Sequence, residues 1–190
     1  LASPPFVDPH THLDKAFFQP TQNISGTLNE AFEIMRQNTA LFHQDDDLAK
    51  RANAALELEF SKGTLAVRTH IDIDTVSGAG GIEQMLRVKE AWKDRVEVQI
   101  VAFPQEGLAG KPQILKSMRS AMEMGADALG GIPCIENCEQ DMREHIDRVF
   151  ELAGEYDKDI DMHIDETDDP NACNLEMLAT QTIAAGWTGR

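Results

Sequence analysis

The sequence is poor in several features, and each shortage limits the class of protein. No apolar run approaches the ~20 residues that a membrane-spanning helix needs, so we expect no membrane contact. Lys and Arg number only 17 against 33 Asp and Glu, which gives a net charge of −16. Because phosphate binding needs clustered basic residues, this balance argues against nucleic acid as a partner. A small neutral or cationic substrate remains compatible with it.

Cysteine is scarce, and its spacing is not that of a disulfide framework. Cys134, Cys138 and Cys173 cannot all pair, so we expect reduced thiols in a cytoplasmic protein. Cys134 and Cys138 could ligate a metal ion, but the sequence has no second pair of cysteines to complete a four-cysteine site. The first five residues contain neither a basic segment nor an apolar stretch, so no signal peptide is predicted.

The chain does contain a regular alternation of strand-like and helix-like segments. The strand-like runs cover 6–12, 65–72, 96–103, 128–133 and 160–164. Amphipathic helical segments cover 29–42, 45–62, 81–93, 112–124, 140–156 and 174–185. Asp45 is expected to cap one helix, and Gly63 and Gly125 to end two of them. The equivalent strand positions Val67, Val98, Leu129 and Ile160 recur every ~31 residues, the size of one βα unit.

This alternation predicts an α/β fold made of parallel βαβ units. Eight such units close a (β/α)8 barrel of about 250 residues, and the five in this chain do not close one. An open doubly wound sheet is the alternative. No glycine-rich phosphate-binding motif follows the first strand, which counts against the dinucleotide-binding version of that sheet.

Histidines stand at the ends of the first and fifth strand-like runs. His10 and His12 are two residues apart, and because strand side chains alternate, both imidazoles are expected on one face. Such a pair is common by chance, so structural or surface histidines are the alternative interpretation. The third histidine, His163, favours a three-nitrogen site for a divalent metal ion at the carboxyl ends of the strands.

An acidic segment follows His163. Glu166 lies three residues further on and would face away if the strand continued. If the chain turns into a loop at Asp165, Glu166 can come back over the metal ion and pass protons between water and substrate. A solvated acidic loop is the alternative.

Three further histidines and one glutamine complete the polar candidates. His70 ends a strand-like run, and we favour a hydrogen-bonded scaffold role over support of the metal ligands. His43 and His145 lie in helical segments and are expected at the surface. Gln105, in the loop after the third run, offers an amide donor and acceptor to the edge of a heterocycle.

Taken together, these segments resemble a known family. The run from Pro5 to Asp14, with His10 and His12, resembles the first metal motif of the amidohydrolase superfamily. Four more segments narrow the resemblance to bacterial cytosine deaminase and its close relatives, including N-alkylamino-triazine hydrolases. They are 25–28, 67–72, 99–107 and 163–166. The resemblance runs in order through essentially the whole chain.

The resemblance implies a (β/α)8 metal-dependent hydrolase barrel with one divalent ion, iron(II) or zinc. His10, His12 and His163 would ligate it. Glu166 would protonate the ring nitrogen of the substrate and help to activate water. The fourth strand lacks the lysine that two-metal members carboxylate, which favours a single-metal site.

The resemblance also implies the substrate and the reaction. Gln105 would hydrogen-bond the pyrimidine edge, and the segment at Leu28 would line the pocket. The expected reaction is hydrolytic deamination of cytosine or a related cyclic amidine, in pyrimidine metabolism, with isocytosine, creatinine or an aminotriazine as alternative substrates. Lys15 and Cys134 occupy loops in which the deaminases vary.

Residues 1–190 correspond to strands one to five of such a barrel. The later strands, with an expected metal-binding Asp and a further His, and the flanking β-sandwich have no counterpart in the sequence. We therefore expect the isolated chain to be inactive and the full-length form to be a homo-oligomer. A non-catalytic metal-binding fragment is the alternative from another class, and its open sheet edges would favour association.

Overall fold

The computed structural model describes residues 3–18, 22–42 and 46–188. The elements in chain order are β1 (Phe6–Thr11), α1 (Leu28–Phe42), α2 (Asp47–Ser61), β2 (Thr64–Asp72), α3 (Gly80–Trp92), β3 (Glu97–Phe103), α4 (Pro112–Met124), β4 (Ala128–Gly131), the short 3-10 helix η1 (Pro133–Ile135), α5 (Glu139–Tyr156), β5 (Asp159–Met162) and α6 (Asn174–Ala184). The predicted alternation of strands and helices is confirmed. Among the described residues, no helix is long and apolar enough to cross a membrane.

The five strands form one parallel sheet in the order β1-β2-β3-β4-β5. Each strand therefore lies beside its neighbour in the chain, whereas a doubly wound sheet reverses its strand order. This sequential order excludes the doubly wound alternative for the described strands. It also brings the carboxyl ends of all five strands to one rim, where their loops meet.

The register of the strands corrects one detail of the predicted repeat. Val67 pairs with Val98, and Leu129 pairs with Ile160, as an even step predicts. Between β3 and β4, however, Leu129 pairs with Ala102 rather than with Val98. Strands that curve into a barrel must be staggered in this way, and a constant step in sequence does not reveal the stagger.

The helices follow from apolar spacing and from residues that stop them, as α4 illustrates. Pro112 occupies its first turn, where a missing N–H is tolerated. Ile114 and Met118 are fully buried against the sheet. Gly125 ends the helix at φ 115°, a left-handed conformation that suits glycine. Gly63 likewise follows the end of α2, at φ 95°.

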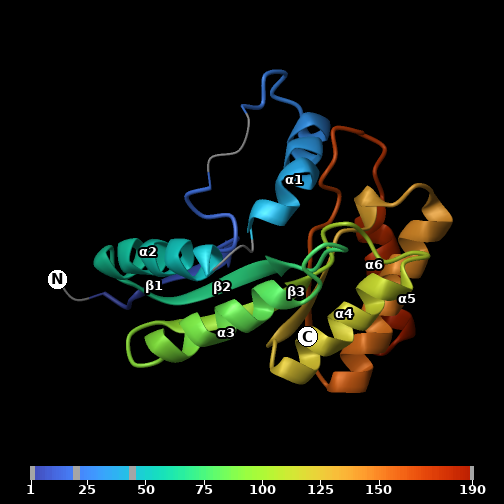
Figure 1. Cartoon of the computed structure of the whole chain (residues 1–190). Helices are drawn as coiled ribbons and strands as arrows, with labels where there is room; N and C mark the ends of the chain where they lie inside the picture. Colours follow the sequence, from blue (N-terminus) through green and yellow to red (C-terminus); the bar gives the residue numbers. More distant parts are fainter. Residues whose placement is uncertain (1–2, 19–21, 43–45, 189–190) are drawn as a thin grey trace.

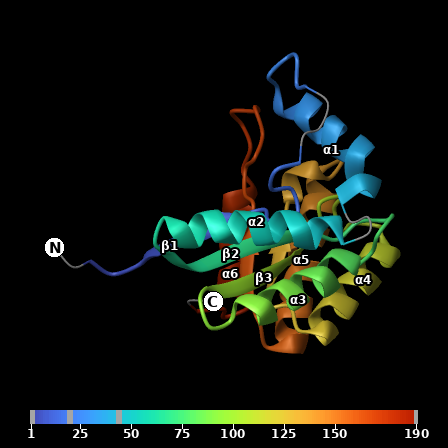
Figure 2. The same ribbon diagram turned by 60° about the vertical axis from the view of Figure 1, so that its left-hand side comes forward.

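The helices α2, α3, α4 and α5 cover the outer face of the curved sheet, while α1 stands over one end of the strands (Figure 1). The same separation of α1 is visible after a 60° rotation (Figure 2). The main core lies between the sheet and the outer helices and includes Ile71, Met85 and Ile100. Polar side chains and α1 lie at the rim formed by the carboxyl ends of the strands (Figure 1).

Two histidines and one helix cap were expected at particular places. His145 was expected at the surface, and this is wrong, because its side chain is fully buried in α5 and hydrogen-bonded to Glu136. A helical position does not by itself say which face of the helix a histidine occupies. His43 and Asp45 lie outside the described residues; Asp46, at φ 59°, is the residue that precedes α2.

Candidate metal centre and adjoining cavity

His10, His12 and His163 form a cluster at the carboxyl rim of the sheet. One ring nitrogen of each lies within 4.8 Å of the others, and Nε2 of His12 is 3.2 Å from Nε2 of His163. His10 is the exposed member, and its ring centroid is 4.7 Å from that of His163. The structure thus brings together the three histidines that the sequence analysis selected, and three imidazoles so spaced can bind one divalent ion.

The strands explain this convergence. His10 lies in β1, and His12 is the residue directly after its end, so alternation directs both rings to the same side. His163 follows the end of β5, where its backbone N–H donates to the carbonyl of Gly131 over 2.8 Å. Phe103, almost fully buried, closes the floor below the rings at a centroid distance of 4.4 Å from His163.

The protonation state of these imidazoles suits metal binding. Burial, with smaller contributions from the charges of His70 and His10, lowers the pKa of His163 to about 4. Burial and the charge of Lys15 lower the pKa of His12 still further. Both rings are therefore neutral at physiological pH, with lone pairs free for an ion. Nδ1 of His163 is buried without a hydrogen-bond partner among the described residues, so the donor set fits a divalent metal.

His70 supports the cluster from below. Its side chain is fully buried, Nε2 lies 3.3 Å from Oδ1 of Asp161, and its ring centroid is 4.6 Å from that of His10. Burial alone would raise the pKa of Asp161, but hydrogen bonds from His70 and Arg68 lower it to about 2. The hydrogen-bonded scaffold role that the sequence analysis favoured therefore describes His70, which also contacts the histidine cluster.

The chain turns at Asp165, and this turn decides where Glu166 lies. Asp165 has φ 54°, and its carboxylate accepts hydrogen bonds from the backbone N–H groups of Asn174 and Leu175 at the start of α6. The Sγ of Cys134 donates to the carbonyl oxygen of Glu166 over 3.2 Å. These contacts hold Glu166 against the rim that carries the histidines.

Glu166 has the environment of a proton donor. Its side chain is half-buried, and burial raises the pKa of its carboxyl above the ordinary value, although the charges of Lys15 and His10 oppose this. A carboxyl group with a raised pKa stays protonated closer to neutral pH. This environment can support general acid chemistry.

A cavity of about 230 Å³ adjoins the cluster, and we call it the inner chamber. It is open to the two half-buried histidines of the cluster and to the three other residues that the sequence analysis selected. Its lining comprises His12, Lys15, Leu28, Ala31, Phe32, Met35, Phe103, Gln105, His163 and Glu166. A volume of this size suits a single small heterocycle.

Lys15 was noted only as a variable position, and the structure gives it specific contacts. Its Nζ lies 2.8 Å from Oδ1 of Asp72 and 3.0 Å from Oε1 of Gln105. Burial alone would lower the pKa of Lys15, but the charges of Asp72 and Asp14 raise it above the ordinary value. The loop after β1 is thereby tied to the ends of β2 and β3. No spacing pattern in the sequence indicated this connection.

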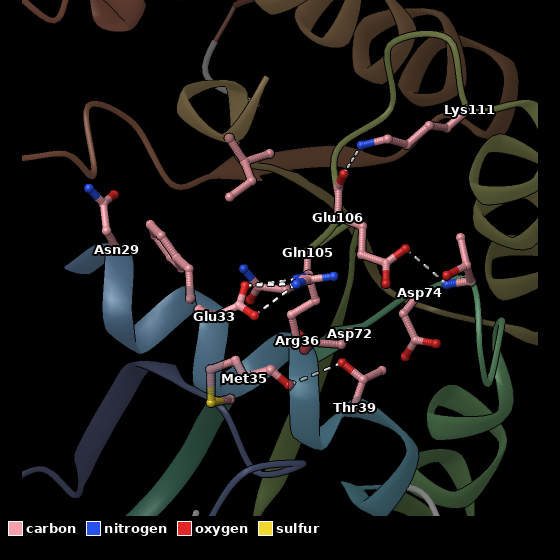
Figure 3. A pocket seen from close by; sticks show the side chains of 13 residues that line it. Asn29, Glu33, Met35, Arg36, Thr39, Asp72, Asp74, Gln105, Glu106 and Lys111 are labelled. Carbon is pink, nitrogen blue, oxygen red and sulfur yellow. Dashed lines mark hydrogen bonds and ion pairs between the residues drawn. The ribbon is translucent and has the colours of Figure 1, made fainter. Parts of the chain in front are cut away.

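A second, larger cavity of about 670 Å³ lies beside the inner chamber and shares Phe32, Met35 and Gln105 with it. The helix α1 supplies one wall, including Glu33 and Arg36, and the loops after β2 and β3 supply the opposite wall (Figure 3). The inner chamber therefore adjoins a wider space under α1.

A second missed feature, at Glu136, fixes the loop that carries Gln105. Oε1 of Glu136 accepts hydrogen bonds from the backbone N–H groups of Leu108 and Ala109 and lies 2.8 Å from Nδ1 of His145. Nε2 of His145 in turn accepts from the N–H of Ile132. This buried pair connects the loop after β3 to β4 and α5.

Comparison with known proteins gives relatives that share this part of the fold. No protein-family model matches the chain. It is 30% identical over 195 residues to the N-isopropylammelide isopropyl amidohydrolase of Pseudomonas sp. strain ADP, and 29% identical over 189 residues to the pterin deaminase of Rhizobium rhizogenes strain K84. These alignments include 100% and 98% of this chain but only 48% and 42% of those proteins.

A solved structure is also similar to this chain over part of its own length. The 5-methylcytosine deaminase of Klebsiella pneumoniae, liganded with phosphonocytosine, superposes with a TM-score of 0.88 at 37% identity, over 96% of this chain and 45% of that one. The five parallel strands form a half-barrel that matches the N-terminal part of an amidohydrolase (β/α) barrel. The resemblance to the amidohydrolase superfamily is confirmed, and the chain spans about half the length of the proteins it matches or less.

Proposed function

We propose that the full-length protein is a metal-dependent hydrolase that deaminates cytosine or a closely related cyclic amidine. The observation that supports this most strongly is the shared chamber. His12, His163, Glu166 and Gln105 line one space of about 230 Å³ at the carboxyl rim of the strands. Groups that bind a metal ion, move a proton and recognise a heterocycle are thus within reach of one small molecule.

In this proposal His10, His12 and His163 hold one divalent ion, iron(II) or zinc. The bound ion supplies Lewis acidity, which lowers the pKa of water so that it is a nucleophile at neutral pH. Phe103 covers one side of the His163 ring with apolar surface, and the ring of His70 packs against that of His10. Low local polarity strengthens the electrostatic contacts between these groups and the substrate.

Glu166 carries the protons. Its carboxyl donates one to the ring nitrogen beside the amine-bearing carbon and takes one from the attacking water. The oxygen of water then bonds to that carbon, and the remaining proton of this oxygen passes through Glu166 to the exocyclic NH2 group. The bond between the carbon and the exocyclic nitrogen breaks, ammonia leaves, and a carbonyl oxygen remains on the carbon. Gln105 binds the edge of the heterocycle, and the apolar side chains of Leu28 and Phe32 cover it.

The test is release of ammonia from a panel of cytosine, 5-methylcytosine, isocytosine, creatinine and an aminotriazine by the full-length protein loaded with zinc or iron(II). We expect turnover of cytosine or its 5-methyl derivative. Glu166→Gln should reduce kcat by a factor of about 10²–10⁴. Glu176→Gln, at an exposed position in α6, is the matched control and should not reduce it. Absence of ammonia from every heterocycle would contradict the proposal.

One comparison favours a second candidate. The relative that is 30% identical is an N-isopropylammelide isopropyl amidohydrolase. The alternative function is therefore hydrolysis of the bond between the ring carbon and the alkylamino nitrogen of an aminotriazine, which releases an alkylamine. Release of alkylamine from N-isopropylammelide, without ammonia from cytosine, would favour it. The wider space under α1 offers room for such an alkyl group.

We also propose that the protein acts in the cytoplasm as a homo-oligomer, in pyrimidine metabolism. The three cysteines are free, which is compatible with a reducing compartment. Cell fractionation tests the compartment, light scattering of the full-length protein tests the oligomeric state, and turnover of cytosine tests the place in pyrimidine metabolism. A monomer, or a protein found outside the cytoplasm, would contradict them.

A further inference from the structure

Gln105 is the recognition group whose orientation the structure explains. A carboxamide can present either its carbonyl oxygen or its NH2 group to a ligand, and exchanging the two reverses the hydrogen-bond pattern that it reads. Oε1 of Gln105 lies 3.0 Å from Nζ of Lys15. An ammonium group has donors and no acceptor, so the atom of Gln105 that faces it must be the oxygen.

Lys15 is itself held in place from the opposite side. Its Nζ donates to Oδ1 of Asp72 over 2.8 Å, and Asp72 is nearly fully buried at the end of β2. The backbone N–H of Asp72 donates to Oδ2 of Asp14, which is fully buried in the loop after β1. Movement of Lys15 away from Gln105 would therefore also break its ion pair with the buried carboxylate of Asp72, which is costly.

The remaining polar group of Gln105 is the NH2. Among residues 3–18, 22–42 and 46–188, no side chain or carbonyl accepts a hydrogen bond from Nε2 of Gln105, and Gln105 lines the inner chamber. The second lone pair of Oε1 lies beside the cationic Nζ. An N–H group of a ligand would meet the repulsion of that charge there, whereas a carbonyl oxygen would be attracted.

We propose that Lys15 is a positioning residue that fixes the Gln105 carboxamide with its N–H groups toward the substrate, and that the site therefore selects heterocycles with a carbonyl oxygen on the edge facing Gln105 over those with an amino group there. This inference rests on the proposed function, which supplies a cyclic amidine as the ligand. It adds the hydrogen-bonding groups that the ligand must carry on the edge facing Gln105.

The experiment compares cytosine with 2,4-diaminopyrimidine, in which an amino group replaces the carbonyl oxygen while the reacting amine is kept. Each is measured with the full-length, metal-loaded protein at a pH where both are neutral. The readout is kcat/KM, with kcat and KM separately, or Kd by calorimetry for a heterocycle that is not turned over. We expect a preference for cytosine of at least ~10-fold, the scale of one unpaired polar group.

The variants separate orientation from general structural support. Lys15→Met frees the amide to rotate and should reduce the preference to less than ~3-fold, while Lys15→Arg should keep it. Gln105→Glu retains an acceptor for Lys15 but removes the N–H groups, so the preference should reverse toward 2,4-diaminopyrimidine. Lys116→Met, at an exposed position on α4, is the matched control for loss of a lysine. Thermal melts identify any variant that fails to fold.

The inference would be overturned if folded Lys15→Met and Gln105→Glu kept the wild-type preference for cytosine over 2,4-diaminopyrimidine. It would also be overturned if these variants lost kcat/KM, or affinity, by the same factor for both heterocycles. The proposed function fails separately. If the preference in Kd follows the prediction but no ammonia is released, the inference stands and the deaminase proposal falls. If ammonia is released but the preference is the same in wild type and Lys15→Met, the deaminase proposal stands and the inference about Lys15 falls. A wild-type protein that binds neither heterocycle contradicts both.

Discussion

At the residue scale, Asp165 shows how one side chain positions another. Its left-handed backbone ends the extended run after β5, and its carboxylate binds the first N–H groups of α6. Left-handed residues other than glycine are tolerated mainly when they are Asp or Asn. The conformation of Asp165 therefore brings Glu166 back toward His163, instead of directing it to the opposite face.

We predict that Asp165→Ala reduces kcat at least ~10-fold and lowers the free energy of unfolding by about 1–2 kcal/mol, because both the turn and the helix cap are weakened. Chemical denaturation and ammonia release measure the two effects. Asp165→Asn, which tolerates the same backbone conformation, is the matched control. Full activity in Asp165→Ala would show that the turn does not position Glu166.

Cys134 gives a second prediction at this scale. Burial, together with the charge of Glu166, raises the pKa of its thiol, and Sγ is hydrogen-bonded to a carbonyl oxygen. Cys138 and Cys173 are exposed. Because the thiolate is the reactive form, iodoacetamide should alkylate Cys134 last of the three near neutral pH. Peptide mass spectrometry over time measures this order, and equal rates would contradict a half-buried, neutral thiol at Cys134.

Sequence patterns locate the histidines of this site but not the contacts of Lys15. The spacing of His10 and His12 on a strand, and a third histidine at a corresponding strand end, were sufficient to select the cluster that the structure brings together. The contacts of Lys15 with Asp72 and Gln105 join residues 57 and 90 positions apart. No local pattern encodes such contacts, because they depend on how three loops fold over one rim.

At the element scale, the loop after β3 depends on the buried pair formed by Glu136 and His145. Burial alone would raise the pKa of Glu136, but hydrogen bonds from His145 and from the N–H groups of Ala109 and Leu108 lower it below its ordinary value. The ionised form of Glu136 therefore stabilises the folded state. That contribution is present above the unfolded pKa of about 4.5 and is lost as the pH falls through the lower folded value.

We predict that Glu136→Gln lowers the free energy of unfolding near neutral pH by about 2 kcal/mol, because a neutral amide oxygen accepts these three hydrogen bonds more weakly than a carboxylate oxygen does. The difference from wild type should shrink as the pH falls below about 4.5. Denaturation measured across this pH range tests the sign. Glu139→Gln, at an exposed position at the start of α5, is the control and should show a much smaller change. A difference that grows at acid pH would contradict the assignment.

Gly107 belongs to the same loop and has no room for a side chain. It adopts φ 86°, and an added Cβ would meet Oε1 of Glu136 at 2.5 Å. Gly107→Ala should therefore destabilise the protein by about 1–3 kcal/mol through strain and displacement of Glu136. Gly110→Ala, also at positive φ but with open space around it, isolates the contribution of the clash. Equal melting temperatures for the two variants would contradict a role for the contact with Glu136.

The elements themselves were largely predictable, and their stagger was not. Apolar spacing locates α3 and α4 to within a residue of their observed bounds, because both helices bury one face on the sheet. The four-residue stagger between β3 and β4 arises from the curvature of the sheet as a whole. The burial of His145 likewise depends on tertiary packing of α5 against the loop that follows β4.

At the scale of the whole molecule, five sequential parallel strands place every strand end on one rim, and this shared rim is what turns scattered residues into a site. The histidine cluster, the inner chamber and the space under α1 all lie there. The proposed hydrolytic activity depends on the binding of a divalent ion by the histidine cluster.

This dependence can be measured as the number of metal ions bound per chain. Calorimetric titration of the full-length, chelator-treated protein with zinc and with iron(II), followed by elemental analysis, should give one tightly bound ion per chain. His163→Ala should abolish that binding, whereas His145→Gln, outside the cluster, should leave one ion bound. Binding should also raise the melting temperature of wild type but not of His163→Ala. Failure of the wild-type protein to bind either ion, or unchanged binding in His163→Ala, would show that the histidine cluster is not a metal site.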